Sequence, residues 1–151
     1  MRFHHSAVVT ALFVAHMTPL VARETIGGYA TWAAFCDEPS KCFAVGAPIE
    51  RRGDPFLTIS ITGRDLRVEA HVGREVRAAT LQIGSARFTL TPSHDNAVAD
   101  IGSSRRIVAA IRAGEAMTVF GTSSSGRFRH HYPLSGAPSA IDAAAVAARR
   151  R

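Results

Sequence analysis

Apolar and polar residues alternate along much of the chain with a period of two, which is typical of β-strands that bury one face. In the clearest run, Leu57, Ile59 and Ile61 alternate with threonine and serine. A Gly-Ser pair at 84–85 has the composition of a two-residue hairpin turn. The alternating runs in the middle of the chain are 56–62, 66–72, 79–83 and 86–91. We therefore predict that strands dominate this part of the protein.

A further hairpin with two cysteines is predicted before this region, with strands at 31–36 and 42–46. If Cys36 faces Cys42, then Trp32 lies opposite Gly46, which leaves room for the indole ring. The cysteines lack the Cys-x-x-Cys spacing of redox enzymes, and no second pair completes a zinc site. We predict a structural disulfide, worth about 2 kcal/mol in the chain-entropy model.

The last third of the chain combines one more hairpin with two short helical stretches. Ser103 or Ser104 can cap a helix that ends at Gly114 and packs on the sheet edge. Ser139 and Asp142 form a capping pair ahead of an alanine-rich helix. The strands of the hairpin are predicted at 117–122 and 127–134. Many short strands with one or two peripheral helices favour an all-β fold, an antiparallel β-sandwich, with a partly closed barrel as the alternative.

The N-terminus has the residue order of an export signal. A short polar start is followed by the mostly apolar stretch 7–22, which ends in the small Ala22. The stretch is shorter than the ~20 residues that a membrane-spanning helix needs. We predict a signal peptide over 1–22 and a single domain over 23–151, with no transmembrane span after cleavage. The alternative is an uncleaved anchor or a buried N-terminal helix.

The chain is strongly basic, with 18 Lys and Arg against 12 Asp and Glu and a formal net charge of +6. In a cytosolic protein this balance would suggest nucleic acid, but an exported protein rarely meets nucleic acid, and the arginines are scattered. We expect no nucleic-acid partner. Attachment to anionic lipids or glycans is a further hypothesis and predicts strong salt dependence. Its candidate contacts are Arg51, Arg52, Arg105 and Arg106.

Two adjacent histidines, His130 and His131, lie on a predicted strand. Neighbouring side chains of a strand point to opposite faces, so the two imidazoles cannot chelate one metal ion. We expect one of them to be buried and the other solvated. Since Phe128 and Tyr132 share the face of His130, a core position for His130 is at least as plausible as a site.

Other candidate chemistry in the sequence is weak. His94 and Asp95 are neighbours in a predicted loop, which seldom gives a base and its orienting acid the geometry they need. The run from Gly121 to Gly126 has the glycine spacing of a phosphate-binding loop but lacks the lysine, and it leads into a strand. We therefore expect no catalytic, metal-binding or cofactor-binding residue and no cofactor.

Several segments, in their order along the chain, resemble the invasion-associated locus B family. They are Gly28–Trp32, Phe35-Cys36, Lys41–Ala44, Tyr132–Gly136 and Ala140–Ala144. The resemblance covers nearly the whole chain after the signal, although the basic ending Arg149–Arg151 departs from the pattern. It implies a bacterial envelope protein with an immunoglobulin-like β-sandwich, named for an association with host-cell entry and without established enzyme chemistry.

The leading hypothesis is an exported, non-enzymatic periplasmic or secreted module that binds or supports other components of the envelope. Its partner would be a protein, lipid or glycan of the envelope or of a host surface. The rival hypothesis is a small-ligand carrier or a hydrolytic enzyme that uses His94, Asp95 or His130.

Overall fold

The computed structural model describes residues 24–38 and 40–150. The predicted signal peptide at 1–22 lies outside these residues. In the described part, ten strands and two helices follow one another: β1 (Glu24–Tyr29), β2 (Trp32–Glu38), β3 (Lys41–Gly46), β4 (Phe56–Thr62), β5 (Asp65–His71), β6 (Val76–Ile83), β7 (Ala86–Ser93), β8 (Asn96–Val98), α1 (Ile101–Ala113), β9 (Ala116–Ser123), β10 (Gly126–Pro133) and α2 (Ala137–Arg149).

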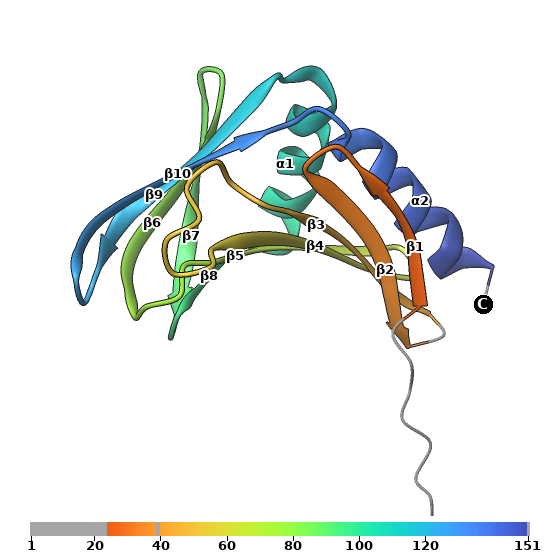
Figure 1. The fold of residues 1–151 in the computed structure, drawn as a ribbon, viewed down its shortest axis with the longest axis horizontal. Helices are drawn as coiled ribbons and strands as arrows, with labels where there is room; N and C mark the ends of the chain where they lie inside the picture. Colours follow the sequence, from red (N-terminus) through yellow and green to blue (C-terminus); the bar gives the residue numbers. More distant parts are fainter. Residues whose placement is uncertain (1–23, 39, 151) are drawn as a thin grey trace, which may run out of the picture.

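All ten strands belong to one sheet in the order β1-β2-β3-β4-β5-β8-β7-β6-β9-β10. Every neighbouring pair in it is antiparallel. The sheet bends into an arch, with β3–β5 in one arm and β6, β9 and β10 in the other (Figure 1). The predicted mainly-β fold with two short helices is confirmed. The two arms of the sheet are joined through β8 and β7, which pair with each other.

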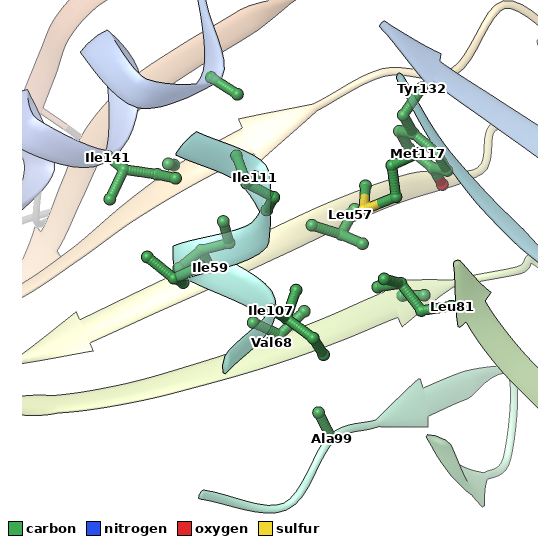
Figure 2. Packing of buried hydrophobic residues seen from close by; sticks show 14 of the residues in the cluster. Leu57, Ile59, Val68, Leu81, Ala99, Ile107, Ile111, Met117, Tyr132 and Ile141 are labelled. Atoms are coloured by element: carbon green, nitrogen blue, oxygen red, sulfur yellow. The ribbon is translucent and has the colours of Figure 1, made fainter. Parts of the chain in front are cut away.

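The inner face of the bent sheet forms the core together with both helices. Leu57, Ile59 and Val68 are completely buried on this face, as their alternation predicted. Figure 2 shows Ile107 and Ile111 of α1 against β4 and β5, and α2 packs mainly on β1, β2 and β3. Both helices thus lie deeper than the peripheral position expected from the sequence, because their apolar sides complete the core.

Helix α1 begins before the serines that were predicted to cap it. The carboxylate of Asp100 accepts hydrogen bonds from the N–H of Ser103 at 2.8 Å and from its hydroxyl at 2.6 Å. The hydroxyl of Ser104 instead accepts from the N–H of Val68 at 3.1 Å, and the N–H of Ala99 donates to the Val68 carbonyl at 3.0 Å. The start of α1 thus completes the hydrogen bonding of β5 where the short β8 has ended. The predicted serine cap is wrong, because the side chain of Asp100 caps the helix instead.

Replacing Ser104 with alanine is expected to lower the free energy of unfolding by about 1 kcal/mol, because the N–H of Val68 loses its acceptor. Urea unfolding followed by circular dichroism measures the change. Ser139→Ala is the matched control, since Ser139 is an exposed serine of the other helix. Equal effects of the two changes would contradict the structural role of Ser104.

Helix α2 also begins earlier than predicted. Gly136, with a φ of 85°, turns the chain into the helix, and Pro138 lies in the first turn. A Cβ at Gly136 would lie 2.2 Å from a backbone oxygen at the end of β1, so only glycine fits. Asp142 lies inside the helix and accepts a hydrogen bond from Arg112 of α1 at 2.6 Å. The capping pair of Ser139 and Asp142 is therefore wrong.

The connection between β3 and β4 crosses β10 and covers its open edge. The N–H of Ile49 donates to the carbonyl of His131 at 2.8 Å. The carboxylate of Glu50 accepts from the N–H of His131 at 2.7 Å. Because an uncovered edge strand can pair with another chain, these bonds protect the end of the sheet.

Candidate functional site

Cys36 and Cys42 form a disulfide across the hairpin of β2 and β3. The two residues are direct partners in the strand register. Both are buried, with 2% and 0% of their surface exposed. The predicted disulfide and register are confirmed, and the buried position gives the bond a structural role at the turn end of the hairpin.

Trp32 fixes the opposite end of the same hairpin. It lies opposite Gly46, as predicted, and a Cβ added to Gly46 would come within 2.6 Å of the indole ring. The indole N–H donates to the carbonyl of Pro133 at 2.9 Å. The ring thus joins the first hairpin to the end of β10, a contact between residues 101 positions apart in the chain that the sequence pattern did not reveal.

His130 lies on the inner face of β10, with 5% of its surface exposed. Its neighbours on that face, Phe128 and Tyr132, are buried as well, so the predicted core face is confirmed. Nδ1 of His130 has no hydrogen-bond partner among the described residues. Burial lowers the pKa of His130, because a charged imidazole is costly in the core. His130 is therefore a core residue with little exposure to solvent.

His94 and Asp95 occupy the turn between β7 and β8, where His94 has a φ of 56°. Among the described residues, no hydrogen bond or ion pair joins either side chain to His130. The carboxylate of Asp95 lies 3.6 Å from Nδ1 of His71, and the side-chain oxygen of Asn96 lies 2.8 Å from the same nitrogen. His71 was not among the residues predicted to form a site, because its place beside Asn96 follows only from the pairing of β5 with β8.

Glu50 and His131 form a clamp between the β3–β4 connection and β10. Nδ1 of His131 pairs with one carboxylate oxygen of Glu50, and the N–H of His131 donates to the other. Partial burial raises the pKa of Glu50, but the hydrogen bonds and charge of His131 help to outweigh this effect, so the pKa is lowered. His131 is exposed, as predicted for one histidine of the pair.

The clamp predicts an acid-dependent loss of stability. Because the pKa of Glu50 is lowered in the folded protein, its contribution is present above the unfolded-state pKa and is lost as the pH falls through the folded-state pKa. Between pH 6 and pH 3, we expect the free energy of unfolding of Glu50→Gln to fall by up to about 1 kcal/mol less than that of the wild type. The difference is small because the pair is solvent-exposed. Urea unfolding at each pH measures this difference. The exposed Glu115→Gln serves as control, and an unchanged pH profile for Glu50→Gln would contradict the clamp.

The outer face of β3, β4 and β5 carries a hollow of about 660 Å³. The ring of Phe43 stacks on Phe35 with centroids 5.1 Å apart, and the ammonium group of Lys41 lies 5.7 Å from the Phe43 centroid. Hydroxyl groups and charges of both signs line the rest. These hydroxyl, ammonium, guanidinium and carboxylate groups can donate hydrogen bonds to a polar ligand or accept them from it. We call this site the β4 hollow, with the lining residues Lys41, Phe43, Thr58, Ser60, Arg67 and Glu69.

The arginines predicted to contact anionic surfaces are all exposed but lie on separate elements. Arg51 and Arg52 belong to the β3–β4 connection, whereas Arg105 and Arg106 belong to α1. The guanidinium group of Arg106 lies 5.7 Å from the ring centroid of Phe88. Their binding to anionic surfaces stays a prediction.

Within residues 24–38 and 40–150, no group of three or more His, Cys, Asp or Glu is placed to hold a metal ion. Neither helix of this part has the length and apolar composition to cross a membrane. Comparison with models of protein families, with curated proteins and with solved structures finds no match. Function is therefore inferred from the residues of this chain.

Proposed function

We propose that the protein is an exported, non-enzymatic module of the bacterial cell envelope, similar to the invasion-associated locus B family. It binds another envelope or host-surface component through the β4 hollow. The observation that carries the proposal is the hollow itself, about 660 Å³ on the outer side of the sheet. Both helices pack their apolar residues on the inner side of the sheet, so they leave this polar outer face open to a partner.

The disulfide supports export, because such bonds persist in the periplasm and outside the cell and are rare in the cytosol. The apolar stretch 7–22 supplies the matching export signal. Cell fractionation with thiol trapping is expected to find a chain without free thiols, cleaved after Ala22, in the periplasm or the medium. A full-length, reduced protein in the cytoplasm would refute export without affecting the binding test below.

The positions of His94, Asp95 and His130 support the non-enzymatic proposal. A general base must reach the proton of a bound substrate, either directly or through one water molecule. His130 is buried in the core, and Asp95 is directed to His71. His94, Asp95 and His130 therefore do not form a pair of nucleophile and base. The β4 hollow, in contrast, offers an accessible binding surface.

Site-specific crosslinking in intact cells tests the β4 hollow. A photoreactive amino acid at Ser60 is expected to capture one specific envelope component, and Arg67→Ala in the same chain is expected to reduce the capture, because both positions line the hollow. The same amino acid at the exposed Ser139 of α2 is the control. Identical products from both positions, or no product from Ser60, would refute binding through the hollow.

A further inference from the structure

The outer face of the other half of the sheet carries threonine and arginine side chains in cross-strand rows. The register aligns four neighbouring strands in one such row, made of Thr89, Thr80, Phe120 and Arg129. The adjacent rows hold Arg87 on β7 and Arg127 on β10. We call this surface the threonine–arginine face, defined by Thr80, Thr89, Thr122, Arg87, Arg127 and Arg129.

The charge on this face has one sign. Two further rows complete this face. The second row contains Arg87, Gln82, Thr118 and His131. The third row contains Ala78, Thr122 and Arg127. No side chain in the three rows is a carboxylate, and the carboxylate of Glu50 pairs with His131 at the border of the face. The β4 hollow differs, because its two cations, Lys41 and Arg67, are accompanied by three carboxylates, Asp65, Glu69 and Asp100. The threonine–arginine face therefore complements an anion, whereas the hollow does not.

Two arginines are held in positions to meet such an anion. The guanidinium group of Arg129 lies 4.8 Å from the ring centroid of Phe120, which orients its plane on the surface. Arg127 is two residues away on the same face of β10, at a distance of roughly 7 Å along the strand. Both border a shallow hollow of about 530 Å³ together with Thr122. A guanidinium group forms paired hydrogen bonds with carboxylate, sulfate or phosphate groups.

We propose that the threonine–arginine face binds an extended acidic polysaccharide. The acidic groups of the glycan pair with Arg127 and Arg129, and its hydroxyl groups form hydrogen bonds with the threonine side chains of β6, β7 and β9. This surface is separate from the β4 hollow, so the protein has two binding faces on one sheet, and each can be tested without the other.

The composition of the face favours a glycan over a lipid bilayer. Attachment to a membrane surface requires apolar side chains that enter the lipid, usually beside a polybasic segment. Of the large apolar side chains that are well exposed, Phe56, Ile101 and Val146 lie elsewhere, and only Ile49 lies at the border of the face, beside His131. Thr118 and Thr122 of β9 lie diagonally beside Arg129, on either side of the half-buried Phe120. Their hydroxyl groups donate and accept hydrogen bonds as sugar hydroxyls do.

Binding of the purified protein to heparin oligosaccharides and to polygalacturonate, with dextran as the neutral glycan, tests the proposal. Calorimetry at low and moderate salt is expected to show saturable, salt-sensitive binding to the acidic glycans alone. The double change Arg127→Gln with Arg129→Gln is expected to weaken this binding at least about tenfold, because two charge-assisted contacts are lost. Arg51→Gln with Arg52→Gln removes the same net charge and is expected to change the affinity less than about threefold.

Equal losses from both double changes, or a larger loss from Arg51 and Arg52, would overturn the proposal in favour of unspecific attraction or of the other basic surface. Thr80→Val with Thr89→Val keeps the shape and is expected to weaken glycan binding while leaving adsorption to phosphatidylglycerol vesicles unchanged. Tighter binding to the vesicles than to either glycan would also overturn it. Arg67→Ala in the β4 hollow is expected to leave glycan binding intact, which separates this proposal from the proposed function.

Discussion

Replacing Gly46 with alanine is expected to destabilise the protein by about 3 kcal/mol, because the core has no room for the added methyl group. The new Cβ would lie 2.6 Å from two carbons of the Trp32 ring and 2.8 Å from a third. The ring cannot move aside easily, since it is 2% exposed and its N–H is bonded to the carbonyl of Pro133. Urea unfolding followed through the fluorescence of this single tryptophan measures the loss.

Gly28→Ala is the matched control for this change. Gly28 also lies in a strand of the same region, but a Cβ added there meets nothing within 4 Å. The substitution is expected to be neutral or to stabilise the protein by a few tenths of a kcal/mol, up to about 1, through the reduced freedom of the unfolded chain. If Gly46→Ala were as mild as Gly28→Ala, the close packing of Trp32 on β3 would be refuted.

The hairpin around the disulfide could be predicted because its determinants are close together in the sequence. The period of two fixes which side chains share a face, and the facing cysteines fix the register. Trp32 then falls opposite Gly46 without further information, as the structure confirms. The same reasoning gave the buried faces of β4 and β10, because each strand carries its own alternation.

The helix starts could not be predicted in the same way because they depend on distant partners. Ser104 is buried as an acceptor for Val68, whose free N–H exists only because β8 stops early. Asp142 pairs with Arg112 on the other helix, although its sequence context resembles a capping pair. In both cases a local rule for capping was overruled by a contact between elements that are separated in the chain.

The candidate sites were missed for a related reason. The arginines predicted to bind anionic surfaces, such as Arg51 and Arg105, lie in a connection and a helix. Arg127 and Arg129 were not predicted, because they alternate with core residues of a strand. The alternation that buries His130 also places these two arginines on the outer face, so the signal was present in the sequence. Only the register of β9 and β10 with β6 shows that threonines from other strands surround them.

Removing the disulfide through Cys36→Ala with Cys42→Ala is expected to lower the free energy of unfolding by about 2 kcal/mol, mainly because the unfolded chain gains freedom. Alanine suits both positions, since the next pair on this face of the hairpin is already Ala34 with Ala44. The fluorescence of Trp32 in the folded state is expected to stay unchanged. Reduction of the wild-type protein is expected to give a similar loss, and unchanged stability in both experiments would contradict a clamping role.

The two largest changes are expected to be independent of each other. Cys42 and Gly46 are four positions apart on β3, which corresponds to roughly 13 Å along a strand. Effects at such a separation usually add to within about 0.5 kcal/mol. Combining Gly46→Ala with the double alanine change is therefore expected to cost the sum of the separate losses. A much smaller combined loss would mean that the disulfide and the Trp32 packing stabilise the hairpin as one cooperative unit, with the ring released once the bond is absent.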